Sequence, residues 1–271
     1  MNTAAPQILL QGAGRMGFAL LSGWLARGAI APRPAVIEPN PSPEVTALAK
    51  SGAIALNTPP EQPVDIAVIA VKPQVFADAV SALAALLAPS TAVLSIAAGK
   101  SLNEMAHLLG RDRPLVRVMP NTPAAIGAGI SVACASAQVT SDLHSACTRL
   151  LEAGGAVAWI EDEGLMDAVT AVSGSGPAYV FYFVECLAAA GRAAGLDAAL
   201  ALRLARETVT GAGALLKART DDPGQLRTEV TSPGGTTQAA LEVLMGEKGL
   251  AELLEVAVEA ARKRSVELSD S

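Results

Sequence analysis

The stretch "ILLQGAGRMG", residues 8–17, limits the possible folds of this chain more than any other. It places Gly12, Gly14 and Gly17 after a strand-like run (8–11) and at the start of a helical run (about 15–27). In this setting the first glycine permits a tight turn, the second lets backbone approach a pyrophosphate, and the third lets helix and strand pack closely. The helix N-terminus adds free N–H groups and the positive end of its dipole. The context predicts a dinucleotide-binding turn, although glycines serving only a turn remain the alternative.

The charge at the end of the second expected strand bears on which dinucleotide is bound. Glu38 lies about 20 residues beyond the third glycine, where a carboxylate can accept hydrogen bonds from the ribose of NAD and repel the 2′-phosphate of NADP. Alternatively, Glu38 is a surface residue before "PNPSP" (39–43), whose amides and Asn40 or Ser42 hold a phosphate. Both interpretations stay open. The cofactor contacts expected from this part of the chain are Gly12, Ala13, Gly14, Arg15, Met16 and Glu38.

Three further segments follow expected strands, at the sheet edge where ligands bind in doubly wound folds. They are "AVKPQ" (70–74), "SIAAGKS" (95–101) and "VMPNTPAAIGAG" (118–129), in which two prolines stiffen the loop around Asn121. A strand stop or an ordinary loop is the alternative for each. The further cofactor contacts expected here are Ala70, Val71, Lys72, Pro73, Ala97, Ala98, Gly99 and Asn121.

The order of strand-like and helical runs divides the chain in two. Up to about residue 160 the two alternate, and "DIAVIAV" (65–71) is apolar throughout, as in a strand buried on both faces. Alternation predicts βαβ units and a mainly parallel sheet. We therefore predict an α/β Rossmann-type domain over 1–162 and an all-α C-terminal domain over 163–271. The helices expected there cover 163–172, 177–194, 197–219, 223–229, 235–246 and 248–268.

Composition excludes several classes of function. The net charge of −6, without a long basic run, argues against nucleic acid or an anionic membrane as partner. Cys134, Cys147 and Cys186 are isolated, and there are two histidines, so we expect no disulfide framework and no metal site. Residues 1–7 lack the basic region of a signal peptide, and the apolar stretch 178–190 is shorter than the ~20 residues of a membrane span. We expect a cytoplasmic protein.

The segment "AVSGSGPAYVFYF" (171–183) opens a helix that is apolar on nearly every side for three turns. Such a helix must be buried all round. A helical part of ~110 residues offers little interior for it, so a partner subunit is the expected cover. Ser173 or Ser175 reaching the active site stays open, and we assign no role to Glu163 or Tyr179.

Six motifs together resemble one family, the pyrroline-5-carboxylate reductases of proline synthesis. They are "GAGRMGFAL", "AVKPQ", "SIAAG", "RVMPNTPA", "AVSGSGPAYVF" and "VTSPGGTTQAAL", in the family's order from about residue 8 to 265. The resemblance implies NAD(P)H-dependent reduction of the cyclic imine Δ1-pyrroline-5-carboxylate to L-proline. It implies that residues 163–271 form an all-α C-terminal dimerisation domain that also binds the substrate. The chain is then expected to be a homodimer, with dimers often assembled into rings. NADPH is the commoner donor in the family, and Glu38 keeps NADH plausible.

The last of these motifs, at residues 230–241, forms a polar corner at the start of a helix. Pro233-Gly234-Gly235 is expected to leave the amides of Gly235, Thr236 and Thr237 unpaired at the positive helix end, which suits a small carboxylate. The resemblance implies that Ser232 and the following amides hold the substrate carboxylate. It also implies that Thr237, the expected catalytic residue, hydrogen-bonds the ring nitrogen. The expected substrate-binding residues are Ser232, Gly234, Gly235, Thr236 and Thr237. A helix cap in which Ser232 and Thr236 bond their own backbone is the alternative.

Two other functions compete with this interpretation. A β-hydroxyacid dehydrogenase would share the glycine-rich start, but it uses a lysine on the long interdomain helix, and residues 174–190 contain none. A sensor or scaffold that binds NAD(P) without turnover would need the glycine-rich turn but not "SPGGTT". The carboxylate corner therefore separates the reductase from the sensor.

Overall fold

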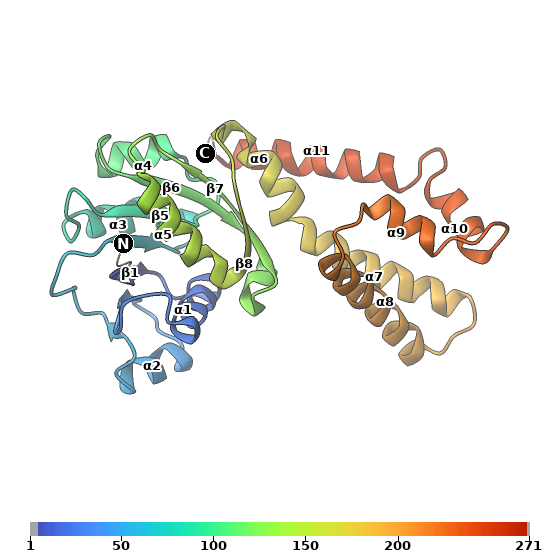
Figure 1. Ribbon diagram of the computed structural model, residues 1–271, viewed down its shortest axis with the longest axis horizontal. Helices are drawn as coiled ribbons and strands as arrows, with labels where there is room; N and C mark the ends of the chain where they lie inside the picture. Colours follow the sequence, from blue (N-terminus) through green and yellow to red (C-terminus); the bar gives the residue numbers. More distant parts are fainter. Residues whose placement is uncertain (1–4, 270–271) are drawn as a thin grey trace. The chain divides into compact units, whose positions relative to one another are not determined.

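The computed structural model of the chain describes residues 5–269 (Figure 1). Residues 1–4 and 270–271, at the outer ends of the two expected domains, lie outside the described residues. Contacts divide the chain into two compact units. The sheet unit runs up to Gly174 and resumes at Arg262, and the helical unit is Ser175–Ala261.

The sheet unit is built on eight strands in the order β3-β2-β1-β4-β5-β6-β7-β8. Neighbouring strands are parallel except β6 and β7, which are antiparallel, so the expected mainly parallel sheet is confirmed. The sequence pattern did not predict β3, because two residues are too few to show a period. The strands are β1 (Ile8–Gln11), β2 (Ala35–Ile37), β3 (Ala55–Leu56), β4 (Ile66–Ile69), β5 (Ala92–Ser95), β6 (Leu115–Pro120), β7 (Gly129–Ala135) and β8 (Gly155–Trp159).

Helices cover both faces of this sheet (Figure 1). Alternate residues of β1 belong to different cores, since Ile8 and Leu10 join one cluster and Leu9 joins the other. All of β4 is fully buried, which explains its unbroken apolar run. One face carries α1 (Arg15–Arg27), α2 (Pro43–Lys50) and α5 (Ser141–Leu151), and the other carries α3 (Phe76–Ala84) and α4 (Leu102–Leu109).

Residues 163–174 form three short segments where one helix was expected. These are the 3₁₀ turn η4 (Glu163–Leu165), α6 (Met166–Val169) and the π-helical turn η5 (Thr170–Gly174). Here η5 contacts β6, and a Cβ on Gly174 would collide with the Met119 side chain. Near the chain end, Ser265 Oγ donates to Asp167 Oδ1 at 2.6 Å. These contacts join both segments to the sheet unit, so its limits differ from the boundary that we expected after Asp162. The remaining short turns are η1 (Pro73–Val75), η2 (Thr122–Ile126) and η3 (Glu152–Gly154).

The helical unit has the start and stop signals that its sequence predicted. Asp197 caps α8 by accepting from the N–H groups of Ala199 and Leu200, each at 3.0 Å. Asp222 caps α9, and Gly195 ends the preceding turn with a φ of +101°. The all-α character is confirmed. The helices are α7 (Gly176–Ala193), α8 (Ala198–Ala218), α9 (Pro223–Glu229), α10 (Thr236–Leu244) and α11 (Leu250–Ser269), the last of which ends in the sheet unit.

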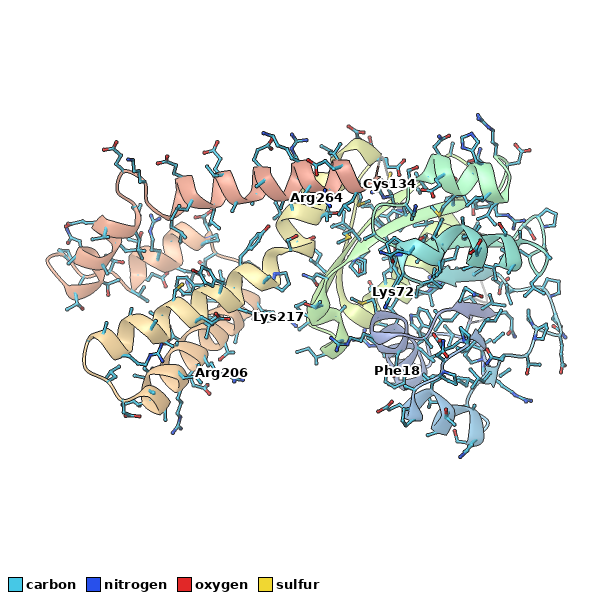
Figure 2. All side chains as sticks on the ribbon, turned by 180° about the vertical axis from the view of Figure 1, so that it is seen from behind. Phe18, Lys72, Cys134, Arg206, Lys217 and Arg264 are labelled. Carbon is cyan, nitrogen blue, oxygen red and sulfur yellow. The ribbon has the colours of Figure 1, made fainter. Side chains whose placement is uncertain are left out.

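Large apolar side chains are exposed on the helical unit. On α7, which packs against α8, Phe181 is 61% exposed and Tyr182 67%, and Ala188 is its one buried residue. A shallow apolar groove of about 420 Å³ runs between the two helices, and Arg206 of α8 lines it (Figure 2). One chain therefore leaves uncovered the helix that we expected a partner to cover. None of the helices within residues 5–269 has the length and apolar character that crossing a bilayer requires.

Candidate cofactor and substrate sites

The glycine-rich turn between β1 and α1 has the geometry that its sequence predicted. Gly12 has a φ of +94°, and a Cβ there would lie 2.7 Å from the carbonyl oxygen of Ala70. A Cβ on Gly17 would collide with the carbonyl oxygen of Gly12. Gly14 is the N-cap of α1 without a side-chain cap, and a Cβ there would meet nothing within 4 Å. Two glycines thus shape the turn, while the third faces open space.

A cavity of about 880 Å³ lies against this turn, within the range of small-molecule sites. Phe18 and Lys72, both labelled in Figure 2, are among the residues that line it. Phe18 and Asp78 were not among the predicted sites. Asn40 and Ser42, which the alternative interpretation of Glu38 named as phosphate ligands, are also part of the lining. The predicted cofactor residues in its lining are Gly12, Ala13, Gly14, Arg15, Glu38, Ala70, Val71 and Lys72.

Glu38 lines this cavity with both carboxylate oxygens already engaged. Its Oε2 accepts from the Ala13 N–H at 2.8 Å, and its Oε1 accepts from the Asn40 N–H at 2.9 Å. Asn57 holds the Glu38 backbone by accepting from its N–H and donating to its carbonyl oxygen. The carboxylate therefore ties the glycine-rich turn to the loop after β2. Each oxygen keeps a second lone pair for a ligand.

The other predicted cofactor residues lie outside this cavity lining. Met16 packs against the core under α1, and Pro73 begins η1. Ala97, Ala98 and Gly99 follow β5, with Gly99 at a φ of +74°. Asn121 follows β6, and its Oδ1 accepts from the Ile130 N–H at 3.0 Å. These residues occupy the carboxyl ends of neighbouring strands, and their contact with a cofactor stays a prediction.

The residues of the cavity fit a dinucleotide phosphate. The uncapped start of α1 presents N–H groups and the positive end of a helix dipole. A side chain at Gly12 would fill the turn, and none stands over Gly14. Arg15 and Lys72 bring positive charge to the lining. A bound NADP would find donors for its pyrophosphate at α1 and cations for its phosphates.

The second candidate site is the start of α10. Gly234 has a φ of +69°, and its N–H donates to Gln238 Oε1 at 2.7 Å. We expected the Gly235 amide to be unpaired, and this was wrong, because it donates to the Ser232 carbonyl oxygen at 3.0 Å in a tight turn. Gly235 is the N-cap and supplies no side-chain cap. Within residues 5–269 no acceptor contacts the N–H groups of Thr236 and Thr237.

An arginine braces the segment that leads into this corner. Arg219 Nη1 and Nη2 donate to the two carboxylate oxygens of Glu229 at 2.6 and 2.9 Å, and its Nε donates to Asp221 Oδ2 at 2.8 Å. These hydrogen bonds hold the pKa of Glu229 and of Asp221 below their ordinary values. The bracing joins the end of α8 to the end of α9, directly before Val230 and the corner. Ser232, Thr236 and Thr237 themselves are exposed.

Comparison with known proteins separates the remaining alternatives. A family model described as pyrroline-5-carboxylate reductase dimerisation matches residues 163–268, and one described as NADP oxidoreductase, coenzyme F420-dependent, matches residues 7–99. The chain is 39% identical to the pyrroline-5-carboxylate reductase of Pseudomonas aeruginosa, over 98% of each chain. This chain belongs to the pyrroline-5-carboxylate reductase family. Its N-terminal domain is of the NADP-dependent oxidoreductase type, and neither a β-hydroxyacid dehydrogenase nor a sensor is favoured.

Relatives beyond bacteria and solved structures agree with this membership. The pyrroline-5-carboxylate reductase of Arabidopsis thaliana is 40% identical over 96% of this chain and 94% of its own. The structure of the Coxiella burnetii family member superposes with a TM-score of 0.90, at 32% identity, covering 99% of this chain and 100% of that one. The Plasmodium falciparum enzyme, solved with NADP bound, has a TM-score of 0.79 at 28% identity, over 97% and 98% of the chains.

Proposed function

We propose that this chain reduces Δ1-pyrroline-5-carboxylate to L-proline with NADPH as the hydride donor, the last step of proline synthesis. The observation that carries the proposal is the start of α10, where the N–H groups of Thr236 and Thr237 have no acceptor within the described chain. A helix N-terminus of this kind binds a carboxylate without an arginine. The full-length similarity to a pyrroline-5-carboxylate reductase supports a polypeptide that combines this corner with a dinucleotide-binding domain.

The substrate site consists of Ser232, Gly234, Gly235, Thr236 and Thr237. The Ser232 hydroxyl and the N–H groups of Thr236 and Thr237 donate to the substrate carboxylate, while Gly234 and Gly235 keep the approach free of side chains. The Thr237 hydroxyl also hydrogen-bonds the ring nitrogen and orients it. Its role is positioning and polarisation, because a threonine hydroxyl is no strong acid.

The cofactor supplies a hydride to the sp² carbon beside nitrogen, and the nitrogen carries a proton, so one hydride and one proton give the amine. The chain contributes orientation and proximity. Gly12, Ala13, Gly14, Arg15 and Met16 would hold the pyrophosphate. The residues that would hold the rest of the cofactor at the sheet edge are Glu38, Ala70, Val71, Lys72, Pro73, Ala97, Ala98, Gly99 and Asn121.

The active form is a homodimer through the helical domain, residues 163–271, and dimers can assemble into a ring. Support comes from the exposed apolar surface of α7 and α8 and from the dimerisation model that matches this part. We propose a cytoplasmic location with neither nucleic acid nor membrane as partner, which agrees with the net charge of −6.

The decisive test follows absorbance at 340 nm with Δ1-pyrroline-5-carboxylate, using NADPH and NADH in parallel. We expect rapid oxidation of NADPH and formation of L-proline, with slower use of NADH. A sample that binds NADPH but oxidises it with neither this imine nor its six-membered homologue would contradict the proposal. The rate with the six-membered imine, compared with that for Δ1-pyrroline-5-carboxylate, shows how strongly the site discriminates by ring size.

A further inference from the structure

An ion pair between a buried arginine and a partly buried glutamate lies outside the cavity, at the carboxyl edge of the sheet. Arg117 in β6 is 8% exposed and is the one charged residue that is buried within residues 5–269. Its Nη1 donates to Oε1 of Glu163 at 2.9 Å. On the neighbouring strand, burial and the charge of Glu163 raise the pKa of the Cys134 thiol, which Figure 2 labels. A charge held this deep needs its partner, because an unpaired buried charge strongly destabilises a fold.

Glu163 makes a second contact with the same oxygen. The N–H of Leu102, the first residue of α4, donates to Glu163 Oε1 at 2.8 Å. A carboxylate at a helix N-terminus is favourable, because it satisfies a free N–H group and the positive end of the dipole. Glu163 thus joins the start of α4, the interior of β6 and the segment that follows the expected boundary.

The contact with Leu102 fixes one end of the loop at residues 96–101. At the other end, Ser95 Oγ accepts from the Ala97 N–H at 3.2 Å, and Ser95 is fully buried. Between these two ties lie Ala97, Ala98 and Gly99, which the proposed function assigns to the cofactor. The position of this loop therefore depends on Glu163.

The strand order indicates which half of a dinucleotide this loop meets. The glycine-rich turn follows β1, and the adenosine side of such sites lies toward β2, where Glu38 stands. The opposite half extends across the switch point toward β4, β5 and β6. The loop after β5 therefore belongs to the nicotinamide half.

We propose that Glu163 is a positioning residue for the nicotinamide half of the cofactor, acting through Leu102 and Arg117. This inference rests on the proposed function for the assignment of the loop. It gives a role to a residue that touches neither the cavity lining nor the carboxylate corner.

The test measures binding of two probes to the full-length protein, NADPH by its fluorescence and adenosine 2′,5′-bisphosphate by calorimetry. The second probe carries only the adenosine half. Glu163→Ala should raise the Kd of NADPH about tenfold, as expected for loss of charge-assisted hydrogen bonds, and leave the Kd of the fragment unchanged. Glu163→Gln keeps an acceptor for Leu102 but leaves Arg117 unpaired, and we expect an intermediate loss.

Recovery of NADPH affinity in a second variant distinguishes a positioning role of Glu163 from a general loss of fold stability. In the double variant Glu163→Gln, Arg117→Met no unpaired charge remains and Leu102 keeps its acceptor, so NADPH affinity should recover toward wild type. This variant also serves if Glu163→Ala does not fold. Glu267→Gln, which breaks the exposed pair of Glu267 with Arg264, is the matched control and should change neither Kd.

Equal weakening of both probes, or an unchanged Kd for NADPH in Glu163→Ala and Glu163→Gln, would overturn the inference. A failure of the proposed function looks different. In that case the wild-type protein would bind both probes and turn over no imine, while the comparison of Kd values would still report on Glu163.

Discussion

The helices α1 and α10 begin in the same way and in different surroundings. Each has a glycine N-cap, Gly14 or Gly235, without a side-chain cap, and neither has an acidic residue in its first turn. At α1 the free N–H groups face a cavity of about 880 Å³ with walls from β2 and β4. At α10 the side chains of Ser232, Thr236 and Thr237 are exposed on their own unit.

This difference separates what local sequence provides from what tertiary structure provides. An uncapped helix start needs only glycines in the right order, and both sites have them. An enclosed site also needs other elements of the fold packed around the start of the helix. Of these two helices, α1 has such elements within its own unit and α10 does not. We therefore expect the cofactor half of the site to be complete in one chain and the substrate half to depend on assembly.

The largest effect should come from Gly12→Ala, which alters the glycine-rich turn at the start of α1. Its φ of +94° costs an alanine roughly 1–3 kcal/mol, and the new Cβ would lie 2.7 Å from a backbone oxygen. We expect a lower Tm and loss of NADPH binding, measured by calorimetry and fluorescence titration. Gly14→Ala is the matched variant, since its Cβ meets open space. It should keep the Tm and weaken NADPH alone, and a fall in Tm equal to that of Gly12→Ala would contradict this division of roles.

The variant Phe181→Asp tests whether the substrate site at the start of α10 depends on assembly of the dimer. Phe181 is 61% exposed in one chain, and burying a carboxylate there in a subunit interface costs roughly 2 kcal/mol or more. We expect monomers by analytical ultracentrifugation, little turnover, and unchanged binding of adenosine 2′,5′-bisphosphate. Lys50→Asp, which introduces the same side chain at an exposed position on α2, should stay oligomeric and active. A fully active monomer would refute the idea that the substrate half needs a partner.

Within the corner, Thr237→Ala should lower kcat/KM about tenfold or more, because a hydrogen bond to a charged group contributes about 1.5–3 kcal/mol. The exposed position implies little change in Tm. Thr237→Ser keeps the hydroxyl and should recover most of the activity. Unchanged kinetics in Thr237→Ala would remove this side chain from the mechanism and leave the carboxylate to the backbone amides.

The sequence predicted those parts of the molecule that depend on neighbours along the chain. The bounds of β1 and α1 agree with the expected runs 8–11 and 15–27, because a strand, a glycine turn and an amphipathic helix each have a strong local pattern. The division of residues 163–174 into three segments was not predicted; part of this stretch, η5, packs against β6, which is distant in the sequence. The contact of Glu163 with Leu102 joins residues far apart in the chain, and no local pattern marks it.

The smallest predicted effect concerns Glu38, where the structure adds a constraint to both interpretations from the sequence. Its carboxylate accepts from Ala13 and Asn40, so it cannot leave the cavity without losing two hydrogen bonds. A negative charge kept there disfavours a 2′-phosphate. We expect Glu38→Gln to shift the ratio of kcat/KM for NADPH over NADH several-fold toward NADPH.

The substitution Glu38→Gln should also weaken the site itself. Glutamine offers a single acceptor oxygen, whereas the N–H groups of Ala13 and Asn40 each need one. Absolute binding of both cofactors should therefore weaken slightly while their ratio changes. Glu61→Gln, a carboxylate outside this cavity lining, should leave the ratio alone. A strong preference for NADPH that is the same in wild type, Glu38→Gln and Glu38→Ala would exclude contact with the ribose. Glu38 would then act only as the tie between the glycine-rich turn and the loop after β2.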